Sequence, residues 1–247
     1  MKIIKISIPD KELTNPQKAF DKFSSFVVRA VKKGQEIDAD SYFGTAKAMS
    51  DEFVKQNKTE ILIKNVKKLS EKLTGMKSQD YAAILYGVIL KVLHGTNHKL
   101  LEPIARNALA IAERNHDPVH IMARGNDLVC IYEQTEKGSK NHLKALYTTK
   151  KALNDICTNY ENVKKRYKTN KTEMKPITNY RFMLATIKFQ IAEILAKTNK
   201  NQAIIELEEA SEILKSFNTP GKLEIKIQNL MTEINSQSWK NKMSVLW

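Results

Sequence analysis

The sequence predicts an all-α fold of about ten helices arranged as antiparallel hairpins, and two observations lead to this prediction. The first is a shortage of turn residues, because 8 Gly and 6 Pro in 247 residues leave little turn chemistry for a many-stranded sheet protein. The second is the recurrence of helix start and stop signals about every twenty residues. With 42% hydrophobic residues, the chain has enough apolar material for one large domain or two small ones.

Each expected element has a local cause. Isoleucines alternate over residues 4–8, which predicts an extended arm without a strand partner. Asn15 and Pro16 then supply a helix cap and a first-turn proline, and Gly34 closes that helix. Further helices are expected over 41–56, 59–75 and 78–94, then to about 115, and over 118–138, 139–167, 178–198, 201–217 and 220–235.

These elements predict three parts of the chain. Residues 1–77 are expected to form the extended arm and a three-helix layer. Residues 78–236 form the region of helical hairpins, and residues 237–247 form a C-terminal apolar and basic tail. Short connections place consecutive helices side by side, which gives either a stacked α-solenoid or an irregular helical bundle.

Small residues recur in the hairpin region and carry a family resemblance. The second helix of three hairpins has two alanines seven residues apart, which lie on one helix face, and the first helices have a small residue where a neighbour would approach. In this respect residues 80–217 resemble the tetratricopeptide repeat, although an irregular bundle rich in alanine explains the same residues. The alanine pairs are Ala105 and Ala112, Ala145 and Ala152, and Ala203 and Ala210, and the small residues are Gly87, Gly125 and Ala192.

The resemblance implies a non-catalytic module or scaffold that binds a protein or peptide in a groove lined by the first helix of each hairpin. Asn126 follows Gly125, where the family commonly places a ligand-facing residue, and Lys188 is a second candidate near the equivalent region of the third hairpin. The expected partner is a protein or peptide of acidic character, given the net charge of +14.

A basic segment favours a different function, nucleic-acid binding. Residues 137–175 contain 11 Lys and Arg against three acidic residues. A stripe of cations with interleaved aromatic residues binds a phosphate backbone or an acidic peptide. A solvated helix end explains the same composition without any ligand. The candidate residues of this segment are Lys164, Lys165, Arg166, Lys168, Tyr160 and Tyr167.

The C-terminal tail has an apolar stripe at helical spacing. This stripe predicts either a terminal helix that packs over the last hairpin or a helix that docks into the groove of a partner. Its residues are Trp239, Met243, Leu246 and Trp247.

The sequence does not favour catalysis. It contains no glycine-rich phosphate loop, its histidine pairs straddle helix breaks, and nothing around Cys130 or Cys157 indicates an activated thiol, so we expect no enzyme activity, cofactor or metal. Because the chain has only two cysteines, we expect them to be buried free thiols in a reducing compartment. The N-terminus is too interrupted for a signal peptide, and the longest apolar run, 81–90, is half a membrane span, so we expect a cytoplasmic protein without an integral membrane segment.

Overall fold

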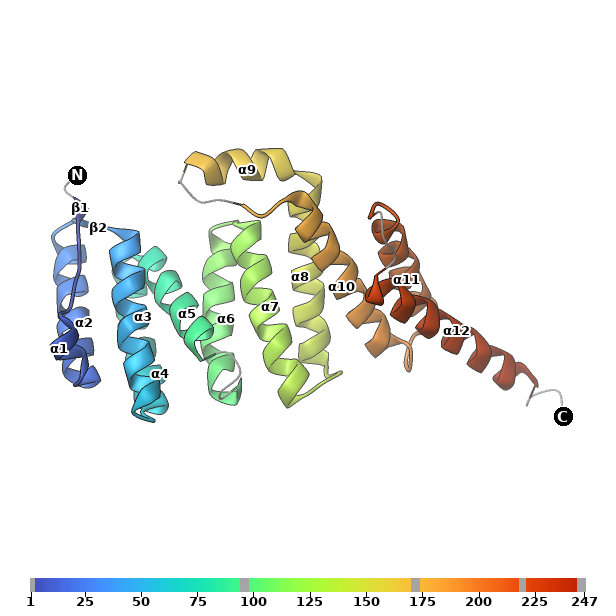
Figure 1. The fold of residues 1–247 in the computed structure, drawn as a ribbon, viewed down its shortest axis with the longest axis horizontal. Coiled ribbons are helices and arrows are strands. Elements are labelled where there is room, and N and C mark those ends of the chain that lie inside the picture. The colour runs from blue at the N-terminus through green and yellow to red at the C-terminus, as the bar shows by residue number, and fades with distance from the viewer. Residues whose placement is uncertain (1–2, 94–97, 170–173, 218–220, 244–247) are drawn as a thin grey trace. The chain divides into compact units, whose positions relative to one another are not determined.

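The computed structural model describes residues 3–93, 98–169, 174–217 and 221–243, and within these ranges the protein is all-α, as predicted (Figure 1). The chain divides into two compact units, Met1–Asn115 and His116–Trp247. None of the helices in the described ranges combines the length and the apolar character needed to span a bilayer.

Two helices of the first unit begin at side-chain caps, and one of these is followed by a left-handed glycine. The Asn15 side chain accepts a hydrogen bond from the Lys18 amide at 3.2 Å, and Asp38 does the same for Ser41 at 2.9 Å. Gly34 ends its helix with a φ of +62°, a left-handed conformation that favours glycine. The elements are β1 (Ile3–Ile4), α1 (Asp10–Leu13), α2 (Pro16–Lys32), β2 (Glu36–Ile37), α3 (Ala39–Lys55), α4 (Thr59–Gly75), α5 (Gln79–Val92) and α6 (His98–Arg114).

Aromatic side chains form the core between α2 and α3. The rings of Phe23 and Tyr42 lie 5.1 Å apart, and those of Phe20 and Phe53 lie 6.4 Å apart. All four side chains are buried, so these rings exclude water between the two helices. Helix α5 packs against both α3 and α4, so the packing continues across residue 77, where the sequence predicts a boundary.

The N-terminal arm has a strand partner, contrary to the prediction. β1 pairs in parallel with β2, with Ile3 opposite Glu36 and Ile4 opposite Ile37. The Asp38 amide continues the pairing by donating to the carbonyl of Ile4 at 2.9 Å. The partner lies more than thirty residues away in sequence, so local alternation of isoleucines could not reveal it.

The second unit stacks its helices in chain order. Helix α7 packs on α8, α8 packs on α10, α10 packs on α11, and α11 packs on α12. Side-chain caps begin three of these helices, from Asp117, Ser139 and Asn199. The elements are α7 (Pro118–Thr135), α8 (Lys140–Thr158), α9 (Tyr160–Thr169), α10 (Ile177–Leu195), α11 (Lys200–Leu214) and α12 (Lys222–Met243).

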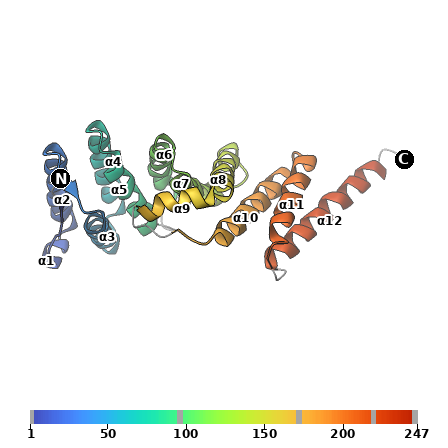
Figure 2. The same cartoon turned by 90° about the horizontal axis from the view of Figure 1, so that it is seen from above.

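The long helix expected over 139–167 is wrong, because the chain breaks after Thr158. Helix α8 ends there, and α9 begins at Tyr160 and runs across the ends of α7 and α8 (Figure 1 and Figure 2). No glycine or proline marks this break. The reason is tertiary, because Tyr160 is buried with 9% of its surface exposed, and a straight helix would not place its ring against Tyr180.

The small residues of the hairpins lie at helix contacts. The six paired alanines and Ala192 are all buried. A Cβ atom added at Gly125 of α7 would lie 2.5 Å from Oγ1 of Thr149 on α8, which is well inside van der Waals contact. The absence of a side chain at this position therefore sets how closely α7 and α8 approach.

We expect Gly125→Ala to lower the free energy of unfolding by about 1 kcal/mol, because overpacking costs roughly 1–3 kcal/mol and the better helix propensity of alanine returns about 1 kcal/mol. In a Thr149→Ala background, which lacks the clashing oxygen, the same substitution should be neutral or stabilising. Urea denaturation followed by circular dichroism measures both differences. Equal losses in the two backgrounds would show that Thr149 does not limit the approach of the helices.

Candidate functional site

Within the basic segment, residues 160–169 form a short helix, α9, that is anchored near both ends. Near its start, the Tyr160 hydroxyl donates to the carbonyl of Lys175 at 2.8 Å, and its ring lies 6.3 Å from Tyr180 of α10. Near its end, the Tyr167 hydroxyl donates to Oδ1 of Asp117 at the start of α7. Only 7% of the Tyr167 surface is exposed. Both tyrosines thus hold α9 against the unit.

Asp117 has two roles, because it caps α7 and also holds α9. Its Oδ1 also accepts hydrogen bonds from the amides of Val119 and His120, each at 3.1 Å, and so caps α7. Burial opposes ionisation of Asp117, but hydrogen bonds from His120 and Tyr167 outweigh it and lower the pKa of this carboxyl. Burial and the hydrogen bond to Asp117 raise the pKa of Tyr167. Asp117 is therefore the acceptor and Tyr167 the donor.

The predicted basic residues of α9 lie at its exposed surface. Lys164, Lys165, Arg166 and Lys168 are all exposed, and the Lys164 amine lies 5.6 Å from the centre of the Tyr160 ring. The structure therefore separates the two residue types that the sequence interleaves, with the cations facing solvent and the tyrosines facing the protein. Only the four cations are placed to contact a partner, and we call them the α9 basic face.

The two groove candidates occupy different environments. Asn126 of α7 is half-buried, and its side-chain amide lies 3.9 Å from the sulfur of Cys130 one turn away. Lys188 of α10 is 4% exposed and is engaged by carboxylates of α11. The structure thus places Asn126 at a partly accessible position and Lys188 inside the unit.

Lys188 belongs to a buried ionic cluster that joins three helices. The Lys150 amine of α8 donates to Oε1 of Glu206 on α11, and the Lys188 amine lies 3.5 Å from Oε2 of the same carboxylate. Lys188 also donates to Glu209, and this hydrogen bond lowers the pKa of Glu209. The Glu206 side chain is only 1% exposed, whereas that of Glu209 is 53% exposed. Glu206 is therefore the buried centre of the cluster.

We expect Glu206→Gln to lower the free energy of unfolding by about 3 kcal/mol, because it leaves buried lysine charge without its central counterion. Glu209→Gln is the matched control, and its loss should stay below about 1 kcal/mol because that carboxylate is half exposed and screened by water. Urea denaturation at neutral pH measures both values. Similar losses for the two variants would contradict the central role of Glu206.

We expect Tyr167→Phe to lower the free energy of unfolding at pH 7 by about 1–2 kcal/mol, because it removes a hydrogen bond to a charged group. The pKa of Asp117 is lower in the folded state than in the unfolded state, so the ionised carboxylate stabilises the fold above the ordinary aspartate pKa of about 4. This contribution is lost as the pH falls through the folded-state pKa. The difference between the variant and the wild type should therefore shrink below about pH 4. Urea denaturation at a series of pH values measures it.

Tyr160→Phe is the control for this pH dependence. Its hydroxyl donates to a backbone carbonyl, which does not titrate, so its loss should be the same at both ends of the pH series. A Tyr167→Phe loss that is equally independent of pH would show that ionised Asp117 is not its partner.

Sequence reasoning missed the buried centre, Glu206, although the sequence contains a signal for it. Glu206 follows Ala203 by three residues and precedes Ala210 by four, so it lies on the same helix face as the paired alanines. A carboxylate on a buried face requires a cation from another helix. Which lysine supplies it depends on the tertiary fold.

The predicted tail residues lie outside what the structure describes. Trp239 and Met243 fall within the range of α12, but their side chains are not among the described ones, and Leu246 and Trp247 lie beyond the described residues. Their predicted packing or docking role stays a prediction.

Comparison with known proteins identifies no family. No family model matches the chain, and no curated protein matches it. A solved structure described as "DHF58 filament" aligns with 15% sequence identity over 95% of this chain and 97% of that chain, with a TM-score of 0.23. A likeness at this TM-score supports no conclusion about fold or function, and the tetratricopeptide resemblance stays a prediction.

Proposed function

We propose that the protein is a non-catalytic interaction protein whose second unit binds an acidic segment of a partner protein through the α9 basic face. The observation that carries this proposal is the orientation of α9, which turns four cations to solvent and two tyrosines inward. Electrostatic complementarity of this kind speeds association and selects partners of opposite charge.

The anchoring of α9 supports this role. Its ten residues are about 15 Å long, and Tyr160 and Tyr167 fix it near both ends. The cations are therefore presented on a fixed backbone, so binding does not have to order this helix. Burial raises the pKa of the Cys130 and Cys157 thiols, which disfavours a thiolate nucleophile and agrees with a non-catalytic role.

Nucleic-acid binding through the basic segment, the alternative that the sequence raises, is less well supported. Proteins that bind single strands stack bases on exposed aromatic rings. The two tyrosines of α9 are buried, so neither ring is available to stack on a base. This favours an acidic peptide, because ion pairs between carboxylates and lysine or arginine need no exposed ring.

The proposal is tested by fluorescence anisotropy with two labelled probes, a glutamate-rich peptide and a DNA duplex of equal charge. We expect the peptide to bind more tightly than the duplex. Replacing the four cations of the α9 basic face by Gln should weaken peptide binding about tenfold or more, since each lost ion pair contributes up to about 1 kcal/mol.

The matched control removes the same charge from other exposed positions of the second unit. Its effect on peptide binding should stay below about threefold, because these residues lie away from α9 and salt screens them beyond about 8 Å. Tighter binding of the duplex, with a log–log salt slope of about −3 to −4, would overturn the proposal in favour of nucleic acid. The control substitutions are Lys140→Gln, Lys144→Gln, Lys151→Gln and Lys197→Gln.

A further inference from the structure

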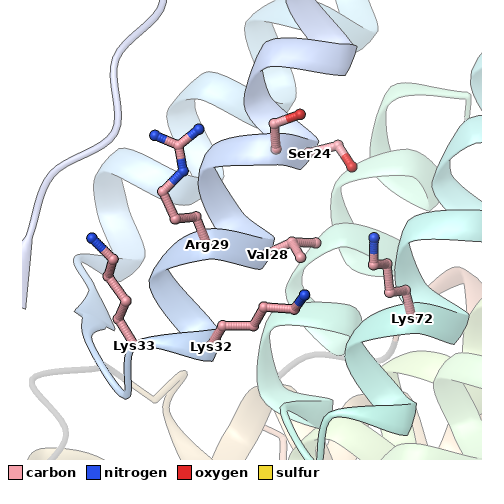
Figure 3. Close-up of a pocket in the computed structure, with 7 residues that line it drawn as sticks. Ser24, Val28, Arg29, Lys32, Lys33 and Lys72 are labelled. Atoms are coloured by element: carbon pink, nitrogen blue, oxygen red, sulfur yellow. The ribbon is translucent and has the colours of Figure 1, made fainter.

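The first unit has a basic depression that the sequence reasoning does not single out. It lies between the C-terminal ends of α2 and α4 and has a volume of about 460 Å³ (Figure 3). This volume is within the range of about 300–1,000 Å³ that small-molecule sites occupy. The lining residues are Ser24, Ser25, Val28, Arg29, Lys32, Lys33 and Lys72.

The chemistry of the lining is that of an anion site. Four of the seven residues are cations, two are serines that donate hydrogen bonds, and none is acidic. In Figure 3, Lys32 extends from α2 toward the helix that carries Lys72, while Arg29 and Lys33 extend from α2 in the opposite direction, and all four line the same depression. The cations therefore form two groups rather than one.

The helix dipole explains part of this arrangement but not all of it. Arg29 and Lys32 are in the last turn of α2, and Lys72 is in the last turn of α4, where cations offset the negative helix end. Each helix end carries only about half a negative charge, which four full positive charges exceed. Among the ion pairs of the described residues, none includes these four cations. The depression thus retains positive charge that a ligand can neutralise.

We propose that this depression binds a compact ligand with at least two phosphate groups. Two groups of cations suit two phosphates, and the guanidinium of Arg29 and the hydroxyl of Ser24 supply directional donors besides the lysine ammonium groups. The same chemistry occurs in a soluble polyphosphate and in the headgroup of a phosphoinositide lipid. This site lies in the first unit and does not depend on the proposed role of α9.

The test is isothermal titration calorimetry of the full chain with inorganic tripolyphosphate. We expect saturable binding by the wild type and a loss of about tenfold or more for the variant Lys32→Gln/Lys72→Gln, since two charge-assisted hydrogen bonds are removed. Vesicle sedimentation, with and without a phosphoinositide bisphosphate in phosphatidylcholine, distinguishes the sources. Binding to those vesicles that the same variant abolishes identifies the headgroup, and binding of tripolyphosphate alone identifies a soluble ligand.

Two control variants separate this site from general attraction to a basic protein. Lys64→Gln/Lys67→Gln removes the same charge from exposed positions of α4 outside the depression, and the quadruple Gln variant of the α9 basic face removes charge from the other unit. Both should bind tripolyphosphate within about twofold of the wild type, because neither variant changes a residue that lines the depression. Failure of the wild type to bind, or an equal loss in any control, would overturn the proposal.

Discussion

The carboxylate of Glu206 is the constraint on which the packing of the second unit depends, because it is almost wholly buried and meets cations from two other helices. An ion in this environment costs several kcal/mol of hydration, which only well-placed partners offset. Lys150 and Lys188 supply that offset from α8 and α10. Sliding α11 by one turn, about 5.4 Å, would carry Glu206 away from both amines. The ionic cluster therefore fixes the register of these helices, while the surrounding apolar contacts supply most of the favourable free energy.

The position of α9 depends on the packing of the other helices of the second unit. Its two anchors belong to helices that are tied to the same core, since Tyr160 meets Tyr180 of α10 and Tyr167 meets Asp117 of α7. Asp117 links local and tertiary structure. Its carboxylate caps α7 and also accepts a hydrogen bond from Tyr167, fifty residues away in the sequence. With both tyrosines turned inward, helical periodicity places Lys165 and Arg166 on other sides of α9, while Lys164, one turn after Tyr160, lies near the Tyr160 ring and remains exposed.

The sequence predicts local features well and long-range features poorly, for a physical reason. Helix ends depend on neighbouring residues, so Asn15, Pro16 and Gly34 mark α2 correctly. The break before Tyr160 depends on a ring contact with another helix, and the partner of β1 depends on a segment more than thirty residues away. Neither leaves a local signal. The depression between α2 and α4 is also invisible in sequence, because its cations come from helices that only the fold brings together.

Lysine is the clearest case in which residue type fails to define a role. Lys188 sits inside the second unit as a counterion, Lys164 faces solvent on α9, and Lys72 lines a depression in the first unit. The net charge of +14 counts them equally, yet only helix face and packing decide which can meet a ligand. The charges of an exposed helix face act on a partner only over about 8 Å, because salt screens them beyond that distance. Such a face therefore selects partners by the density of their charge. A depression with hydroxyl donors and a buried floor at Val28 adds geometry to charge, so it selects for the number and spacing of anionic groups.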